Sequence, residues 1–215
     1  MSDSCQCQGI ERKFDRAYVA RKLSEYRRRG PAATTLQLVD ALRSLGVDGM
    51  TLLDVGAGLG AIQHGLLGSG VREAVSVEAS SAYTEAARDE AKRLGLADRI
   101  VNVQGNFVDL ADQIADADVV TLDRVICCYD DMERLVGRSA ERARRLYGVV
   151  YPRDTWWVRA GMAVWYNVRH RLQQNTMRNF VYRTTDVEAA IQRHGLERRF
   201  HRDMWAWQVA VFARR

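Results

Sequence analysis

The sequence predicts an α/β domain with a doubly wound, mostly parallel seven-stranded sheet that ends in an antiparallel C-terminal hairpin. Two observations support this fold class. Short apolar runs alternate with amphipathic runs from residue 49 onward, a pattern typical of parallel strands joined by right-handed crossovers with helices on both faces. The last two apolar runs are separated by a very short connection, and strands joined so closely must be antiparallel.

The composition fits one compact unit. The chain has 215 residues, of which 47% are hydrophobic, and only two prolines, so a single sizeable core is expected. We expect residues 1–48 to form a helical extension or lid and residues 49–215 to form the main domain. Within that domain, residues 153–183 form an insertion rich in tryptophan and arginine.

The extension is predicted to hold two helices. The spacing of Ile10, Phe14 and Leu23 indicates a helix over residues 10–28, which Gly30 and Pro31 would end. An apolar stripe predicts a second helix that closes at Gly46; its members are Leu36, Val39, Leu42 and Leu45.

The main domain then follows the alternation. Strands are predicted at residues 50–55, 73–78, 99–104, 117–123 and 146–152, the last of them stopped by Pro152. The helices between them are predicted at residues 61–67, 80–95, 107–115 and 131–145. Ser80 or Ser81 would cap the second of these helices and Gly95 would end it. A final helix over 184–195 and two strands over 196–203 and 204–215 complete the expected order.

A glycine-rich loop carries the strongest functional signal. In TLLDVGAGLGAIQHGLL, Asp54 stands at the end of the first predicted strand, and Gly56, Gly58 and Gly60 follow. Glycine tolerates positive φ and lets a ligand approach bare backbone, and ligands of doubly wound sheets bind at the carboxyl ends of the strands. The loop therefore predicts a ligand site at that edge.

The same glycines also fit the relaxed dinucleotide fingerprint, and a match to that pattern alone has low specificity. Three features favour a methyl donor instead. First, if the loop bound a dinucleotide, Asp54 would place a negatively charged carboxylate beside the ligand's pyrophosphate, which gains nothing from it. Glu78 ends the second strand, where an acid can accept from both ribose hydroxyls. The antiparallel hairpin replaces the second nucleotide-binding half that a dehydrogenase needs.

In these residues the chain resembles the class I S-adenosylmethionine-dependent methyltransferases. Residues 54–60 are similar to their first motif, Glu78 to the acid of the second, residues 104–107 to the third and residues 122–125 to the fourth. Asn106 stands where the family usually has Asp. The resemblance implies a Rossmann-like methyltransferase fold, S-adenosylmethionine as cofactor and S-adenosylhomocysteine as product. It implies a cofactor site made of Asp54, Gly56, Ala57, Gly58, Gly60, Glu78, Ala79, Gly105, Asn106, Phe107 and Asp123. The N-terminal helices also resemble, with low specificity, those of magnesium-protoporphyrin O-methyltransferases.

Two residues after the fourth strand are candidate catalytic groups. A sulfonium donor carries its own leaving group, so the enzyme mainly aligns an in-line displacement. Asp123 and Tyr129 could position or deprotonate an acceptor there. In the other interpretation Asp123 only ends a strand and Tyr129 packs. His64, in the helix after the glycine loop, either faces the site or is bonded locally.

The acceptor is predicted to bind beneath the extension and the insertion. Tyr18, Arg153, Trp156 and Trp157 are the candidate substrate-binding residues. The insertion also holds aromatic and arginine side chains suited to a flat or anionic acceptor, namely Trp165, Tyr166, Phe180, Tyr182, Arg159, Arg169 and Arg171. The alternative is an amphipathic helix packed on the sheet with a solvated basic face.

Four cysteines occur, as Cys5 and Cys7 and as the adjacent pair Cys127 and Cys128. We expect thiols rather than disulfides, and no metal site is predicted because neither pair has the C-x2-C spacing of a zinc knuckle. If the N-terminus folds over the active edge, the four thiols could instead hold a soft metal or a metalloid such as arsenite. Otherwise they are small apolar or lid residues.

The predicted function is methyl transfer to a small molecule. Within that class the alternatives are a porphyrin-type carboxylate acceptor and a thiol or metalloid acceptor. The net charge of +5 allows a nucleic-acid methyltransferase or binder, although no N/D-P-P-Y-like tetrapeptide follows the fourth strand. A donor-binding scaffold without chemistry and a nicotinamide-dependent oxidoreductase are further alternatives. The first residues carry no apolar signal segment and no run is long enough to span a membrane, so a cytoplasmic location is expected.

Overall fold

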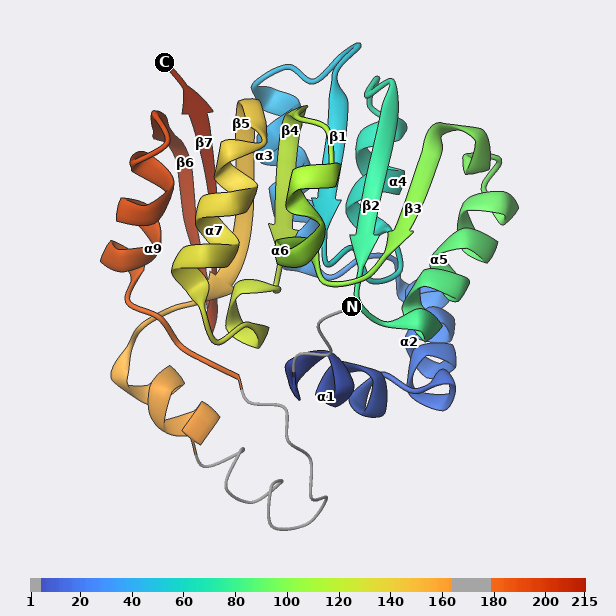
Figure 1. The fold of residues 1–215 in the computed structure, drawn as a ribbon, viewed down its shortest axis with the longest axis horizontal. Coiled ribbons are helices and arrows are strands. Elements are labelled where there is room, and N and C mark those ends of the chain that lie inside the picture. The colour runs from blue at the N-terminus through green and yellow to red at the C-terminus, as the bar shows by residue number, and fades with distance from the viewer. Residues whose placement is uncertain (1–4, 164–178) are drawn as a thin grey trace.

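The computed structural model describes residues 5–163 and 179–215 and contains a seven-stranded sheet in the order β3-β2-β1-β4-β5-β7-β6 (Figure 1). The first five strands are parallel, and β7 runs antiparallel to both of its neighbours, β5 and β6. The predicted fold class is confirmed. The strands are β1 Thr51–Val55, β2 Glu73–Glu78, β3 Ile100–Gln104, β4 Ala117–Asp123, β5 Ala143–Pro152, β6 Leu196–Met204 and β7 Trp207–Arg214.

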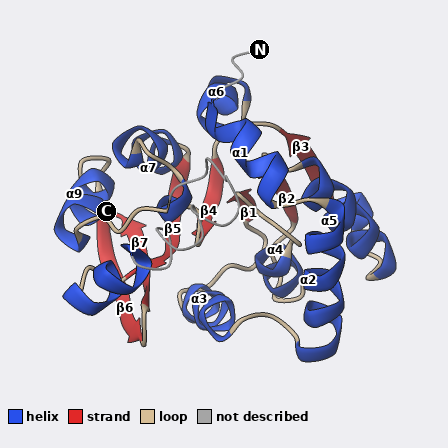
Figure 2. Ribbon diagram, turned by 90° about the horizontal axis from the view of Figure 1, so that it is seen from below, coloured by secondary structure: helices blue, strands red, loops and turns tan. Residues whose placement is uncertain are grey.

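Helices cover both faces of the sheet (Figure 2). One apolar cluster joins the sheet to α3 Ala33–Ser44, α4 Ala61–Leu67 and α5 Ser81–Arg93. A second cluster joins the other face to α6 Phe107–Leu110, α7 Met132–Glu141 and α9 Thr184–Gln192. In the described part of the chain, three short 3-10 turns lie in the connections, η1 Ala97–Arg99, η2 Ala111–Gln113 and η3 Ile126–Cys128. The central strands are therefore buried on both sides, which leaves their carboxyl ends as the accessible edge.

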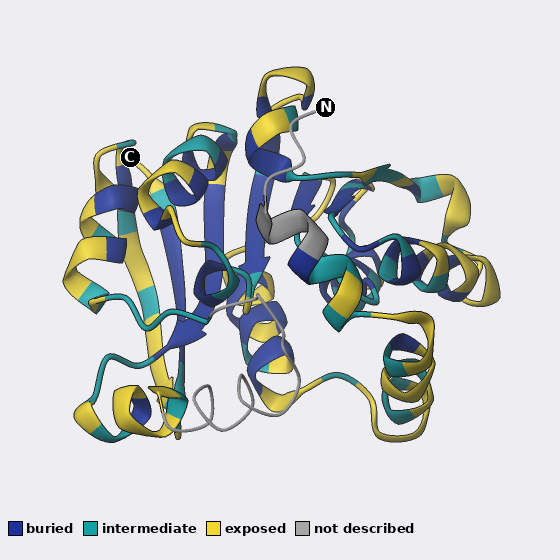
Figure 3. Ribbon diagram, turned by 60° about the horizontal axis from the view of Figure 1, so that its bottom comes forward, coloured by how far each residue is buried: buried dark blue, intermediate teal, exposed yellow. Residues whose placement is uncertain are grey.

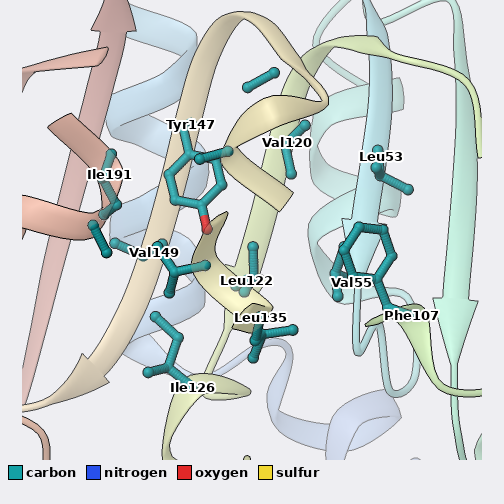
Figure 4. Close-up of a cluster of buried hydrophobic side chains, with 14 of the residues drawn as sticks. Leu53, Val55, Phe107, Val120, Leu122, Ile126, Leu135, Tyr147, Val149 and Ile191 are labelled. Carbon is teal, nitrogen blue, oxygen red and sulfur yellow. The ribbon is translucent and has the colours of Figure 1, made fainter. Parts of the chain in front are cut away.

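The second cluster shows how the buried face is built. Tyr147 from β5 is fully buried among Val149, Leu122 and Ile191 (Figure 4). Its hydroxyl lies 2.7 Å from the Ser139 hydroxyl of α7, so the one polar atom of this large side chain is satisfied. Each such apolar side chain contributes roughly 1.5–3 kcal/mol on burial, and the cluster fixes β4 and β5 beneath the site.

The N-terminal extension differs from the prediction. The single helix expected over residues 10–28 is two helices, α1 Cys5–Lys13 and α2 Arg16–Arg29. Asp15 causes the break because its side chain accepts a hydrogen bond from the Tyr18 backbone N–H at 2.7 Å and so caps a new helix. The break lets α1 lie across the carboxyl ends of the central strands (Figures 1 and 3).

A buried carboxylate attaches α2 to the main domain. Glu90 of α5 is fully buried and accepts from Arg27 of α2 at 2.8 Å and from Arg93 at 2.6 Å. The hydrogen bond from Arg93 is the first cause, and the one from Arg27 a further cause, that lowers the pKa of Glu90 to about 2. The carboxylate is therefore ionised throughout the neutral range and bridges the two helices.

Replacement of Glu90 should loosen this attachment. We expect Glu90→Gln to lower the free energy of unfolding by about 1–2 kcal/mol at pH 7, because two half-exposed guanidinium groups lose a buried partner. The effect should shrink as the pH falls toward the lowered pKa. Denaturant unfolding measures it. Glu85→Gln, which breaks the exposed pair with Arg16, is the control and should change stability by less than about 0.5 kcal/mol; equal effects would contradict the bridging role.

Two further boundaries differ from prediction. The helix expected over 131–145 ends at Glu141, and β5 begins at Ala143, because Ala143 pairs with Ala117 of β4 in the parallel ladder. Tertiary pairing thus overrides the helical propensity of the following arginines. In the insertion, residues 156–163 are helical, whereas Trp165, Tyr166, Arg169 and Arg171 lie outside the described residues.

Across residues 5–163 and 179–215, no helix combines the length and apolarity needed to cross a membrane.

Candidate functional site

A cavity of about 690 Å³ opens at the carboxyl ends of β1, β2 and β4. The glycine loop and the strand ends form its floor, and α1, α2 and the start of α3 cover it. Many of the residues predicted for the site line it, namely Tyr18, Asp54, Gly56, Ala57, Gly58, Glu78, Ala79, Gly105, Asn106, Phe107, Asp123 and Tyr129. The fold therefore brings the four motif regions into one space.

The glycine loop needs its glycines for different reasons. Gly56 has φ +67°, and a Cβ there would lie 2.5 Å from Val125, which follows β4. Gly58 has φ +55°, and a Cβ there would meet nothing within 4 Å. Gly56 is thus required for packing against β4, whereas Gly58 presents bare backbone to open cavity space. Gly60 begins α4 in the left-handed conformation.

Glu78 closes the floor of the cavity beside the glycine loop. Its carboxylate accepts from the Gly58 backbone N–H at 2.8 Å and from the Ser80 backbone N–H at 2.9 Å. Burial raises the pKa of this carboxyl, and the backbone donors act in the opposite direction. Because a carboxylate has about four acceptor positions, Glu78 keeps capacity for hydroxyl donors from a ligand.

Asp54 is held inside the sheet rather than at its surface. The side chain is 1% exposed and accepts from the Thr121 hydroxyl at 2.8 Å and from the Gln63 amide at 3.2 Å. Burial raises its pKa to about 7 in spite of these two donors. Asp54 therefore changes charge near neutral pH, directly below the glycine loop.

Asp123 ends β4 and is engaged by the N-terminal extension. Its carboxylate accepts from the Thr35 hydroxyl of α3 at 2.5 Å and from the guanidinium of Arg124 at 3.0 Å. Arg124 is a non-glycine residue with φ +61°, a conformation that costs energy and clusters at functional sites. These contacts favour a positioning role for Asp123 over that of a free base.

Tyr129 lines the cavity beside Asn106. Its hydroxyl accepts from the Asn106 amide at 3.3 Å, and Asn106 in turn accepts from the Val108 backbone N–H at 3.3 Å. Burial raises the pKa of Tyr129, so the phenol stays protonated at neutral pH. Tyr129 can therefore donate or accept a hydrogen bond to an acceptor, but it is a weak base.

His64 bonds to the extension. The Tyr26 hydroxyl of α2 lies 3.0 Å from its Nδ1, so its partner comes from a distant helix and not from its own turn. Burial lowers the pKa of His64, which keeps the imidazole neutral. Its role here is to join α2 to the helix that follows the glycine loop.

The three insertion residues predicted to bind substrate do not line the cavity. Arg153 pairs with Asp203 at 2.7 Å, and the Trp157 ring lies 5.7 Å from that of Trp205 at the β6–β7 turn. Trp156 is 80% exposed. From the described part of the insertion, Asn179 reaches the cavity wall, and the Phe180 backbone N–H donates to the Cys127 carbonyl at 2.7 Å.

Several lining residues escape sequence reasoning. They are Ile10, Lys13, Phe14, Tyr26, Thr35, Tyr83 and Trp207. The rings of Phe14 and Tyr83 meet edge to face, with their centroids 5.3 Å apart, in the wall of the cavity. The only local signal was Tyr83, an aromatic residue in the helix turn that follows Glu78.

The cysteines fall into two groups. Cys127 and Cys128 form the end of η3 and line the cavity, with their sulfurs 3.7 Å apart. Cys5 and Cys7 belong to α1, but their side chains lie outside the described set. Among the described residues, no group of three or more histidine, cysteine, aspartate or glutamate side chains could hold a metal ion.

Comparison with known proteins agrees with this geometry. Residues 53–148 match the family model described as a methyltransferase domain. No curated protein sequence matches the chain. Magnesium protoporphyrin IX methyltransferase from Synechocystis, solved with bound S-adenosylmethionine, is similar in structure at TM-score 0.72 and 13% identity over 100% of both chains.

Two further solved structures are similar. A candidate RNA methyltransferase from Pyrococcus horikoshii matches at TM-score 0.59 and 14% identity, over 86% of this chain and 84% of that one. A complex from Haloferax volcanii between a methyltransferase activator and a candidate methyltransferase matches at TM-score 0.68 and 14% identity, over 95% of this chain and 96% of that one. At such identities these structures establish the fold.

The fold and the matched domain define the class: residues 53–148 form a methyltransferase domain, set in a sheet with the Rossmann-like class I architecture. The motifs in residues 54–60 and at Glu78, which predicted S-adenosylmethionine as the cofactor, lie within this matched domain.

Proposed function

We propose that the cavity binds S-adenosylmethionine and that the protein transfers its methyl group to a small-molecule acceptor by in-line displacement. The observation that carries this proposal is the cavity of about 690 Å³ above the glycine loop, lined on its other side by the chain's own N-terminal helices. Such a volume lies within the usual range of small-molecule sites. Residues 1–48 then act as the lid of a domain formed by residues 49–215.

The residues of the cavity fit the donor. The carboxylate of Glu78 would accept from the ribose hydroxyls, for which it keeps free acceptor positions. Bare backbone at Gly58 would face the methionine portion, and Asn106 and Phe107 would hold the adenine. When bound, the sulfonium donor supplies both the methyl group and its leaving group. The chain orients the partners and excludes water through its aromatic and helical cover.

Calorimetric titration of S-adenosylhomocysteine into the protein tests the donor assignment. We expect micromolar binding that NADH does not displace. Displacement by NADH, or no binding by the folded protein, would contradict the proposal.

Glu78→Gln should weaken this binding about tenfold or more. The substitution replaces an anionic acceptor with a neutral amide, whose NH2 group would face the backbone N–H of Gly58 or Ser80. A hydrogen bond to a charged group contributes roughly 1.5–3 kcal/mol, and the loss of one such bond to the ligand gives the expected weakening. The same titration measures the loss. Glu73→Gln is the matched control, because Glu73 lies exposed at the opposite end of β2. An equal effect of the two substitutions would refute the role of Glu78.

A carboxylate-bearing acceptor is the favoured substrate class. The described lining includes four cationic side chains, on Lys13, Lys22, Arg29 and Arg124, together with a polar residue, Thr35, and an aromatic one, Trp207. Lys22 and Arg29 share the carboxylate of Glu25, and Arg124 pairs with Asp123. The likeness to the magnesium protoporphyrin IX enzyme extends over the entire chain. Turnover assays with porphyrin carboxylates, small thiols and RNA fragments compare the acceptor classes; methylation of RNA alone would overturn the small-molecule assignment.

A further inference from the structure

We propose that Cys127 and Cys128 form a dithiol site that binds a trivalent arsenical in the wall of the cavity. The two thiols are adjacent in the chain, both line the cavity, and their sulfurs are 3.7 Å apart. Both are free. The proposal rests on this juxtaposition and not on methyl transfer.

Among the residues that the structure describes, the two sulfurs have only weak hydrogen-bond partners. Apart from each other, they contact the Arg124 carbonyl at 3.5 and 3.8 Å, and the Cys128 sulfur lies 3.8 Å from the Asn179 amide oxygen. Thiols are poor hydrogen-bond donors, so a ligand that forms two covalent bonds to sulfur loses little by displacing these contacts. Cys127 is buried and Cys128 half-buried, which leaves Cys128 as the thiol that a cavity ligand meets first.

The charges around the pair favour attack by Cys128. The hydrogen bond between the two thiols lowers the pKa of Cys128 and raises that of Cys127. The positive charge of Lys13, from α1, acts downward on the pKa of both. Because the thiolate is the reactive form, Cys128 bonds first and Cys127 closes the chelate.

The number of donors selects the ligand. Two sulfurs are present, and the described residues offer no third histidine, cysteine or carboxylate that would complete a metal site with them. A structural zinc ion requires four ligands. A linear two-coordinate ion needs its sulfurs on opposite sides, which adjacent residues of one turn cannot provide. A trivalent arsenical with one organic substituent needs only two sulfurs, and thiolates prefer such soft centres.

The reaction balances without an oxidant or a reductant. With an arsenoxide, R–As=O, the two S–H bonds and the arsenic–oxygen bond break, two arsenic–sulfur bonds form, and one water leaves. Arsenic stays trivalent and both sulfurs keep their oxidation state.

Phenylarsine oxide is the probe, and the full chain with Cys5→Ser and Cys7→Ser is the protein, so that Cys127 and Cys128 are its remaining cysteines. No donor is added. We expect one equivalent to remove both thiols from titration with a chromogenic disulfide, and the intact mass to rise by one arsenical less one water. Two titratable thiols after one equivalent would overturn the site.

Single substitutions provide the second test. Cys128→Ser should weaken arsenical binding on the order of 100-fold, because one thiol loses the effective concentration that the second provides. Cys127→Ser should weaken arsenical binding by a similar factor, and circular dichroism checks that this variant folds. If it does not fold, the result for Cys128→Ser, at the half-buried position, tests the proposal. Unchanged affinity in Cys128→Ser would refute the proposal. Titration with S-adenosylhomocysteine is run separately, so a failure of donor binding is distinguished from a failure of the dithiol.

Discussion

Gly58→Arg should abolish measurable binding of S-adenosylhomocysteine, a loss of at least 1000-fold or about 4 kcal/mol. Gly58 lines the cavity, and a Cβ there meets no protein atom within 4 Å. An arginine side chain would therefore extend into the space proposed for the donor and for its product S-adenosylhomocysteine, and would exclude both by its volume. Calorimetric titration measures the loss, and thermal unfolding shows that the variant is folded.

The matched control for this substitution is Gly95→Arg. Gly95 has a φ of +70°, similar to the +55° of Gly58, and a Cβ at Gly95 would also meet nothing within 4 Å. It ends the turn after α5 and is not among the residues that line the cavity. Both variants carry the backbone strain of a positive φ, roughly 1–2 kcal/mol, but only Gly58→Arg should lose the ligand. If Gly95→Arg lost it equally, strain and not occupancy of the cavity would be the cause.

Asp54→Asn should stabilise the protein at pH 8. In the folded state burial raises the pKa of Asp54 from an ordinary 3.8 to about 7. Between about pH 4 and about pH 7, Asp54 is therefore protonated in the folded protein but ionised in the unfolded chain. The stability of the wild-type protein falls as the pH rises through this range. The full difference is at most roughly 4 kcal/mol.

The substitution removes this charge but keeps the shape. The amide can still accept from the Thr121 hydroxyl, and the Gln63 amide can turn to present its oxygen. We expect a gain of about 2 kcal/mol in unfolding free energy at pH 8 and none below pH 4, measured by denaturant unfolding across pH. A loss of stability at pH 8 would contradict a burial-raised pKa.

Asp118→Asn is the control with the opposite sign. Asp118 lies on the neighbouring strand β4, and the hydrogen bond that it accepts from the Thr51 backbone N–H is the main cause of its lowered pKa. Its carboxylate contributes stability at neutral pH that disappears as the pH falls through the lowered pKa. Asp118→Asn should therefore destabilise the protein at pH 8, where Asp54→Asn stabilises it.

The sequence alone predicted the parts of the protein that depend on local constraints. Alternating apolar runs predicted the strands, and a very short connection predicted the antiparallel hairpin, since both follow from backbone geometry. The glycines from Gly56 to Gly60 and the acid Glu78 predicted the donor edge, because parallel strands bring their carboxyl ends together whatever the intervening helices are.

Only the tertiary structure decided how the cavity is closed. Thr35 meets Asp123, Tyr26 meets His64, and Phe14 meets Tyr83, and in each pair the partners lie far apart in the chain. The spacing of apolar residues in the sequence does not predict such contacts, because it depends only on neighbours within one helix turn or one strand. The same reason applies to Arg153. The sequence predicted it as a substrate-binding residue, whereas in the structure its guanidinium pairs with the carboxylate of Asp203. It also explains why the one helix predicted over residues 10–28 is two helices that meet at Asp15. The cap at Asp15 is a local feature, but the bend places α1 over strand ends that are distant in the sequence.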